Sequence, residues 1–327
     1  MSEKSPKNNL LRAILVVFTF GFVGCGNQAV RTTFTQTTTE VNENLPRVVA
    51  TTSVLCDLTR QIAENTVNLT CLISPTANPK VYQPKPEDRK AIEQANLILY
   101  TGYNFESNSI ALIKSTKNSA SKIAVAQVAV SKPQKFIQGG KRVSDPYIWH
   151  NTKNAIAMVE VINSNLKKLP SSDAELYTSN TQKIKNELTQ LDNWIKSTIA
   201  SIPVKQRKLV TTSEAFGYYA KAYGISLAGG MEGIRTQEKL TTLRVNNLAK
   251  NIKQAKVPTI FPEVAINPNL IQSVAREADV QISQRRLYSE GLGEPGGDAD
   301  TYQKMMIANT RTIVEGLGGT YLMFQAK

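Results

Sequence analysis

A serine, a histidine and a lysine in this chain could supply a nucleophile and its base. Ser213 could pair with His150, the only histidine among 327 residues, or with Lys80, and Glu290 could orient the base. The residues around Ser213, VTTSEAF, lack the glycines of a G-x-S-x-G nucleophile elbow. These residue types therefore favour a binding site over a catalytic one, and we expect no enzymatic activity.

The chain has three cysteines, and their spacing matches no metal-binding pattern, because no C-x-x-C pair occurs. Cys56 and Cys71 lie fifteen residues apart, at a predicted helix start and in a neighbouring strand. An exported protein could join them in a disulfide. Two unpaired buried thiols are the alternative, and the sequence leaves both open.

The third cysteine, Cys25, follows a segment with the features of an export signal. Three cations precede an eleven-residue apolar run, Ala13–Val23, whereas a membrane-spanning helix needs about 20 residues. We therefore predict a signal peptide over residues 1–24. The run ends in FVGC, which resembles a bacterial lipobox and implies lipid on Cys25; an ordinary signal peptide is the alternative. Residues 25–46, rich in Thr and Asn, are predicted to be the lipidated cysteine and a flexible tether.

The formal net charge of +13 would suit nucleic acid, an anionic membrane surface or an acidic partner. The densest basic stretch, KPQKFIQGGKR at Lys132–Arg142, holds four cations and one aromatic residue. It lacks the stacking pattern of nucleic-acid-binding segments. We therefore expect no nucleic-acid binding, and a solvated basic surface is the simplest interpretation.

Short apolar runs alternate with helical patterns from Arg47 onward. RVVATTS, VNLTCLIS, NLILYTG and KIAVAQV predict strands, and most are separated by helical patterns. After a polar stretch, Ser131–Pro146, the alternation resumes beyond Ser201 with KLVTTS, VPTIFP and DVQIS. Successive βα units build parallel sheets. We predict an α/β fold of two βα lobes whose parallel sheets face a cleft.

One long helix is predicted between the lobes. A capping-box pair, Ser172 and Glu175, precedes it. Apolar residues then recur at three- and four-residue steps, which places them on one helix face: Ile184, Leu188, Leu191, Ile195 and Ile199. The predicted domains are a lobe at 47–170, a linking helix at 171–202 and a lobe at 203–327. A helix of this length, roughly 45 Å, would join the lobes rigidly.

Four polar stretches are distributed through both halves. They are NPKVYQPKPEDRKAIEQANLILYTGYNFE, SDPYIWHNTKN, TTSEAFGYYAKAYG and LYSEGLGEPGGDADTYQKMMIANTRTIVEGL. In order and spacing they resemble the ligand segments of solute-binding lipoproteins of bacterial zinc, manganese and iron ABC importers, over nearly all of Arg47–Leu322. The resemblance implies a lipid-anchored monomer on the periplasmic or cell-surface side, with an ABC importer permease as its membrane partner.

The same resemblance implies a ligand cleft, but with substituted ligands. The family's first two histidines fall on Lys80 and Tyr147, and its aspartate falls on Glu290. Its remaining ligand, His or Glu, falls on Ser213, and a shift of one residue would place Glu214 there. The His-rich loop of many zinc-binding members is missing as well.

These oxygen ligands, with His150 as one available nitrogen, suit manganese or iron better than zinc. We predict Tyr147, Glu214, Glu290 and His150 as the metal set of an importer for a divalent or transition metal. Lys80 opposes this, because an ammonium about 4 Å from a divalent ion repels it by roughly 8 kcal/mol at an effective dielectric near 20. Binding then requires Lys80 to swing into solvent or to lose its proton.

The alternative hypothesis is that Lys80 has replaced the ion and pairs with Glu290 or Glu214 across the cleft. The protein would then be a degenerate homologue that holds no metal. It would bind another small solute or a partner, or serve as an adhesion-type lipoprotein.

Overall fold

The computed structural model describes residues 42–138, 141–170, 173–211, 214–228, 241–264 and 268–326. They belong to a compact unit, Val41–Lys327. The predicted signal peptide and Cys25 lie outside the described residues, and the domain boundaries stay predictions. No helix of the described part combines the length and apolarity needed to cross a bilayer.

A four-stranded parallel sheet forms the centre of the first lobe. Its strands, in the order β2-β1-β3-β4, are β1 (Arg47–Ala50), β2 (Asn68–Cys71), β3 (Leu97–Tyr100) and β4 (Ser121–Ala124). Successive side chains of a strand point to opposite faces. Val48 and Ala50 therefore join one buried cluster and Val49 another, so both faces of the sheet are covered.

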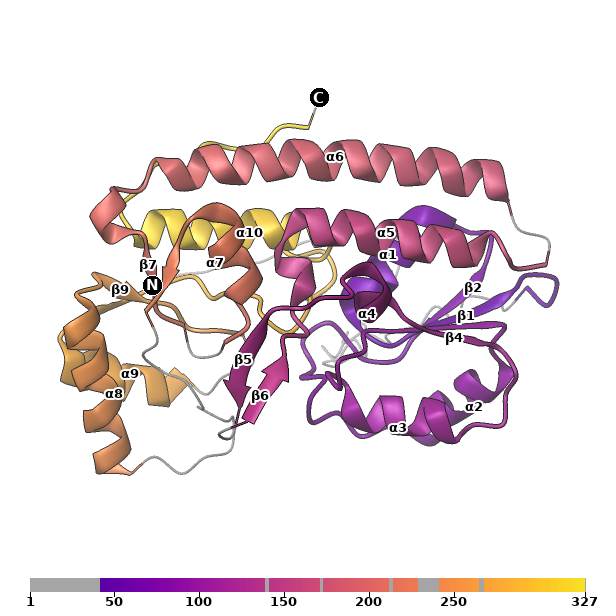
Figure 1. Ribbon diagram of the computed structural model, residues 1–327, viewed down its shortest axis with the longest axis horizontal. Coiled ribbons are helices and arrows are strands. Elements are labelled where there is room, and N and C mark those ends of the chain that lie inside the picture. Colours follow the sequence, from indigo (N-terminus) through magenta and orange to yellow (C-terminus); the bar gives the residue numbers. More distant parts are fainter. Residues whose placement is uncertain are drawn as a thin grey trace, which may run out of the picture. The chain divides into compact units, whose positions relative to one another are not determined.

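Helices pack on both faces of this sheet, as expected for a parallel α/β arrangement. The helices are α1 (Ser53–Ala63), α2 (Pro86–Gln94), α3 (Ser107–Ser115), α4 (Val125–Ala129) and α5 (Thr152–Leu166). Figure 1 shows α2 and α3 on one side of the sheet and α1 and α5 on the other. This confirms the predicted α/β class for the first half.

The second lobe repeats the scheme with shorter strands. Its strands are β7 (Lys208–Leu209), β8 (Ser226–Leu227), β9 (Thr259–Ile260) and β10 (Gln281–Ile282), in two parallel pairs. A parallel bridge between Thr211 and Phe261 connects the pairs. Its helices are α7 (Gly217–Tyr223), α8 (Thr242–Ala255) and α9 (Pro268–Ala278). Apolar residues of α8 and α9 bury against Val210 and Ile260 in a separate core.

The predicted long helix is α6 (Ala174–Ala200), whose 27 residues span about 40 Å. Its N-cap is Asp173, whose carboxylate accepts the backbone N–H of Leu176 at 3.1 Å; Ser172 lies outside the described residues. The five apolar residues of the predicted face are all buried. They pack α6 against α1, α5 and the last helix, α10 (Tyr302–Gly316) (Figure 1).

One local prediction was wrong in detail, and one element was not predicted. The predicted strand KIAVAQV divides into β4 and the short helix α4. The polar stretch Ser131–Pro146 contains an antiparallel hairpin, β5 (Lys135–Gln138) paired with β6 (Lys141–Ser144). Two glycines between short strands are a recognised hairpin signal, so the sequence carried this information. Two 3-10 turns, Ile148–His150 and Val204–Gln206, complete the described elements.

The two cysteines left open by the sequence are joined. Cys56 lies buried in α1 and Cys71 lies exposed in β2, and a disulfide links them across a Cα separation of 5.7 Å. It ties α1 to the strand that leads into the Lys80 loop.

Removing this link should destabilise the fold. A cross-link that closes a fifteen-residue loop contributes about 3 kcal/mol by constraining the unfolded chain. We expect a Cys56→Ala/Cys71→Ala variant to lose about that much unfolding free energy in urea. Reductant should lower the stability of the native chain and leave the variant unchanged. Two titratable thiols in the denatured, unreduced native chain would contradict the link.

Candidate functional site

Three segments from both lobes converge on one point. Lys80 lies in the loop after β2, where its backbone N–H donates to Asn78 Oδ1 at 3.0 Å. Tyr147 precedes a 3-10 turn, and its backbone N–H donates to the buried Asp145 Oδ1 at 2.9 Å. Glu290 lies between β10 and α10. Loops beyond the carboxyl ends of parallel strands are where α/β folds bind ligands.

An ion pair joins two of the predicted cleft residues. Lys80 Nζ lies 3.2 Å from Glu290 Oε1, and the side chains are 34% and 11% exposed. The Tyr147 hydroxyl donates to the same oxygen at 2.9 Å. Its ring centroid lies 4.8 Å from Lys80 Nζ, within reach of a cation–π contact. The structure therefore brings Lys80, Tyr147 and Glu290, three of the predicted cleft residues, together.

Acidic groups surround the Lys80 ammonium. Burial raises the pKa of Glu290, Lys80 lowers it, and Glu263 raises it further. Burial also raises the pKa of Asp145 to about 7, with a smaller rise from Glu214 and a small opposing effect from Lys80. Glu290 Oε2 is buried without a hydrogen-bond partner. Lys80 thus pairs with Glu290, and its charge opposes the effect of burial on the pKa of both Glu290 and Asp145.

His150 lies in the protein interior and not on the surface of the cleft. It is fully buried against Phe216, whose ring centroid lies 4.7 Å away. Its Nε2 donates to the Ser289 carbonyl at 3.0 Å, and its Nδ1 has no hydrogen-bond partner. Burial lowers the pKa of His150 to about 4. The imidazole is therefore neutral near pH 7, with Nε2 committed to the backbone beside Glu290.

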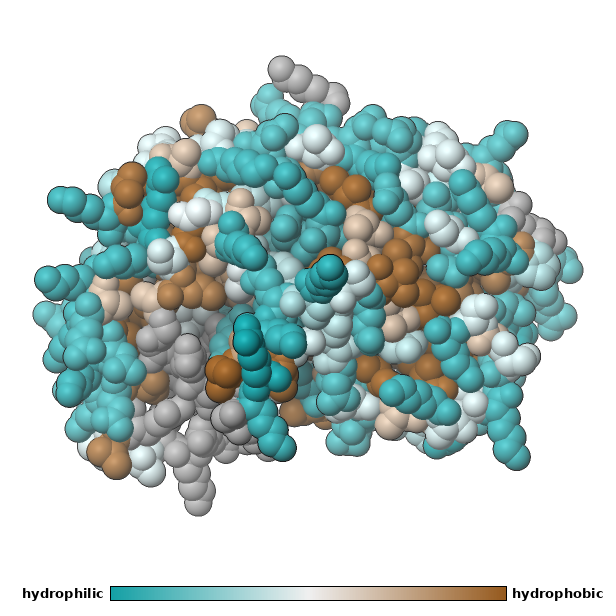
Figure 2. Space-filling view, viewed as in Figure 1, coloured by the Kyte–Doolittle hydropathy of each residue, from teal (hydrophilic) through white to brown (hydrophobic). Residues whose placement is uncertain are grey.

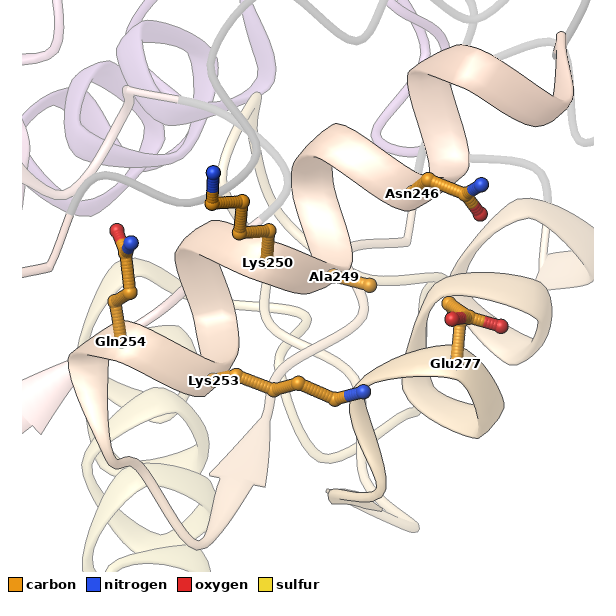
Figure 3. Close-up of a pocket in the computed structure, with 6 residues that line it drawn as sticks. All are labelled: Asn246, Ala249, Lys250, Lys253, Gln254 and Glu277. Carbon is orange, nitrogen blue, oxygen red and sulfur yellow. The ribbon is translucent and has the colours of Figure 1, made fainter.

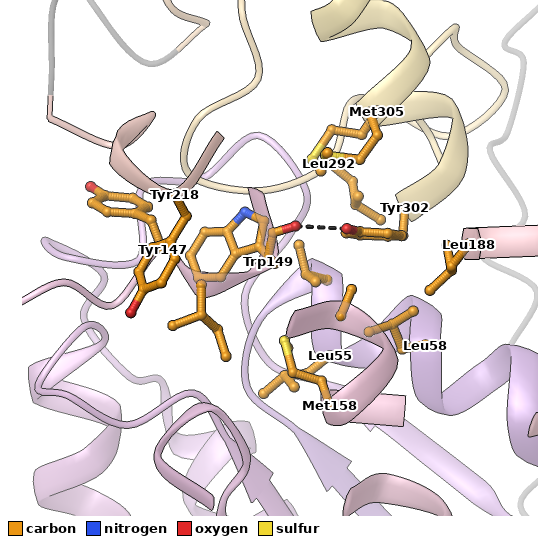
Figure 4. Close-up of a cluster of buried hydrophobic side chains, with 14 of the residues drawn as sticks. Leu55, Leu58, Tyr147, Trp149, Met158, Leu188, Tyr218, Leu292, Tyr302 and Met305 are labelled. Carbon is orange, nitrogen blue, oxygen red and sulfur yellow. Dashed lines mark hydrogen bonds between the residues drawn. The ribbon is translucent and has the colours of Figure 1, made fainter. Parts of the chain in front are cut away.

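Aromatic packing fixes Tyr147. Phe105, Tyr147 and Trp149 contact one another edge to face at centroid distances of 5.2 to 5.4 Å. The Tyr302 hydroxyl of α10 donates to the Trp149 carbonyl at 2.6 Å. Figure 4 shows Trp149 between Tyr147 and Tyr302, with this bond dashed. The cluster joins the Tyr147 segment to α10 and holds the hydroxyl toward Glu290.

Backbone contacts fix the Glu290 segment. The buried Asn309 side chain accepts from the Tyr288 N–H at 2.8 Å and donates to the Tyr288 carbonyl at 2.9 Å. Ser53 Oγ of α1 accepts the Leu292 N–H at 3.0 Å. A Cβ at Gly291 would lie 2.5 Å from that oxygen, so only glycine permits the approach. Glu290 is therefore held between α10 and α1.

Two carboxyl groups outside the predicted ligand set also act on the site. Asp145 and Glu263 are buried, and both raise the pKa of Tyr147 by their charge. Their places at an Asp-Pro turn and at a strand end were the available signals. Glu214 raises the pKa of Asp145 and so lies near the same cleft. Ser213 lies outside the described residues.

The arrangement does not form a ready metal cage. Within the described ranges, no three His, Cys, Asp or Glu side chains are grouped as metal ligands. The two contacts to Glu290 Oε1 come from Lys80 and Tyr147. A metal ion would therefore have to displace the ammonium.

Two lobes, a rigid connecting helix and a cleft lined by loops beyond the strands define a solute-binding protein. The profile of the family described as "Zinc-uptake complex component A periplasmic" matches residues 48–316. The chain belongs to this family, which supplies the extracytoplasmic binding proteins of metal ABC importers. The predicted family, fold class, transport role and location are thereby confirmed.

Relatives support this assignment over most of their length. The metal ABC transporter substrate-binding lipoprotein ScbA of Streptococcus cristatus is 30% identical, over 93% of this chain and 97% of ScbA. The manganese ABC transporter substrate-binding lipoprotein PsaA of Streptococcus anginosus is 31% identical, over 83% and 89%.

Solved structures agree on the fold. The periplasmic zinc binding protein TroA of Treponema pallidum matches with a TM-score of 0.76 and 29% identity, over 84% of this chain and 99% of TroA. The Mn-bound periplasmic metal binding protein of Candidatus Liberibacter asiaticus matches with a TM-score of 0.72 and 22% identity, over 83% and 99%. At that identity the second match supports the fold alone.

The buried His150 should make stability depend on pH. Its pKa is about 4 in the fold and 6.5 in the unfolded chain, which therefore binds more protons between these values. Native stability should fall as pH drops from 6.5 to 4, by about 3 kcal/mol from this group. A His150→Gln variant keeps a donor for Ser289 and cannot titrate.

Urea unfolding at several pH values measures how the unfolding free energy of the native chain and of His150→Gln depends on pH. The native chain should lose more stability than His150→Gln across this window, while the other titrating groups act on both. Parallel pH profiles would contradict the neutral, buried imidazole.

Proposed function

We propose that this chain binds a divalent or transition metal ion as cargo and delivers it to an ABC importer, with manganese or iron preferred over zinc. The observation that carries the proposal is that the acidic cleft already holds a cation, the Lys80 ammonium, on Glu290. Oxygen donors suit manganese and iron. Among the relatives, PsaA is named for manganese and TroA for zinc.

Loading is then an exchange of one cation for another. Lys80 is a third exposed, and its flexible stem can carry the ammonium into solvent. The ion would take its place on Glu290 and Tyr147, with Glu214 as a further oxygen ligand. His150 would contribute through Nδ1, because Nε2 donates to Ser289. The carrier has no turnover in this scheme, and it acts as a monomer without nucleic acid.

A second candidate function rests on the same ion pair. If Lys80 stays on Glu290, its ammonium neutralises the carboxylate, and the cleft would bind a small polar solute or a partner in place of a metal ion. Burying an ion pair costs nearly what its attraction returns, so the pair alone does not decide between the two. Membership in a metal importer family favours the metal carrier.

Metal binding can be tested on residues 41–327, prepared without metal. A metal at about 100 times its Kd should add about 2.7 kcal/mol to the unfolding free energy. We expect Mn²⁺ or iron to raise the melting temperature more than Zn²⁺ or Ca²⁺. Lys80→Met removes the competing ammonium, so it should bind the metal more tightly and be less stable without it.

Lys90→Met is the matched control, because Lys90 is an exposed lysine on α2 that faces no described ion-pair partner. It should behave like the native chain. If no metal stabilises the native chain or Lys80→Met, the metal proposal fails and the second function stands.

The anchor is a separate part of the proposal. We propose that Cys25 carries the lipid, because the relatives ScbA and PsaA are named as lipoproteins and FVGC resembles a lipobox. In a bacterial host, membranes washed with high salt should retain the native chain and release Cys25→Ser. Cys71→Ser should stay at the membrane. Mass spectrometry of the mature N-terminus should find diacylglycerol on Cys25, and an unmodified Cys25 would contradict the anchor.

A further inference from the structure

The β5–β6 hairpin is a basic element that the transport function does not use. Four exposed cations lie on it and just before it: Lys132, Lys135, Lys141 and Arg142. None of them forms an ion pair with any described residue. No Asp or Glu occurs between Glu106 and Asp145, a stretch that contains seven cations. The hairpin therefore presents uncompensated positive charge.

Several cations elsewhere on the molecule have acidic neighbours. Lys185 and Lys304 pair with Glu160 and Asp300. The groove between α8 and α9, with a volume of about 400 Å³, combines Lys250 and Lys253 with Glu277 (Figure 3). The hairpin differs from these sites, because its four exposed cations lie close together in a stretch that contains no Asp or Glu.

Apolar side chains accompany these cations. Ile137 is 57% exposed and pairs with Arg142 across the hairpin, so the two share a face. The opposite face carries the half-buried Phe136 and Val143. Figure 2 shows hydrophilic and hydrophobic side chains side by side over β5 and β6. A face that combines Lys and Arg with an exposed aliphatic residue fits an anionic membrane interface.

Two tyrosines hold the base of the hairpin. The Gln134 N–H donates to the Tyr218 hydroxyl of α7 at 2.9 Å, and the Tyr103 hydroxyl donates to the Val130 carbonyl. A lone two-stranded hairpin is marginally stable in water. These bonds attach its base to both lobes and leave its cations outward.

We propose that the β5–β6 hairpin docks this protein on anionic lipid headgroups of the membrane, with Ile137 at the interface. The positive charge of the hairpin is complementary to anionic headgroups. Because the hairpin carries no Asp or Glu, it offers no pattern of opposite charges that would fix one orientation on a protein partner, and a fluid lipid surface requires none. A chain from the proposed anchor, Cys25, to Val41 reaches roughly 55 Å when extended. The proposed anchor at Cys25 would keep the protein near the membrane, and the hairpin itself would bind the lipid headgroups.

The test is co-sedimentation of residues 41–327 with vesicles of phosphatidylcholine alone or mixed with phosphatidylglycerol. This chain lacks Cys25 and is prepared without metal, so the result does not depend on the anchor or the cargo. We expect binding only to the anionic vesicles, and salt should weaken it. Each cation near such a surface strengthens binding about fivefold. Lys135→Gln/Arg142→Gln, which removes the two cations on the face of Ile137, should therefore weaken it about 25-fold, and Ile137→Ser should weaken it further.

Lys250→Gln/Lys253→Gln on α8 removes the same charge at exposed positions and is the matched control. It should bind the vesicles nearly as well as the native chain, and all variants should melt at the native temperature. Three results would overturn the proposal: equal binding to both kinds of vesicle, equal loss in the α8 control, or binding only to membranes that contain the importer permease.

Discussion

The ion pair between Lys80 and Glu290 is the interaction on which the cleft depends. It closes a contact between the loop after β2 and the segment before α10, and Tyr147 donates to the same carboxylate oxygen. Removing one partner of a largely buried pair leaves the other charge uncompensated. Lys80 and Glu290 therefore depend on each other, and under the proposed function a cargo ion would compete with an ammonium that is already in place.

The rest of the fold keeps these two residues within reach of each other. The disulfide fixes β2, and thereby the start of the Lys80 loop, to α1. The same helix accepts the Leu292 N–H through Ser53, so α1 contacts both sides of the cleft. The long helix α6 packs on α1 and α10 together. The packed helices α1, α6 and α10 thus hold the segments that contain Lys80 and Glu290 in place.

Much of this architecture could be predicted from the sequence, because strand and helix periodicities are local signals. The face of α6 marked by Ile184 and Leu188 is buried as expected. The site was less predictable, because burial there depends on contacts between distant segments. The prediction of His150 as a ligand did not specify which nitrogen is available, and its Nε2 is committed to Ser289, 139 residues further along the chain. The electrostatic effect of Asp145 and Glu263 on the site likewise depends on their burial, which an Asp-Pro turn and a strand end do not reveal by themselves.

The most direct measurement of the central claim is a crystal structure of residues 41–327 grown with Mn²⁺, with data collected at the manganese absorption edge. The account predicts an anomalous peak beside the Glu290 carboxylate and the Tyr147 hydroxyl, with the Lys80 side chain turned into solvent. Lys80 still on Glu290 in crystals with saturating Mn²⁺, and no peak in the cleft, would contradict the exchange of the ammonium for a metal ion.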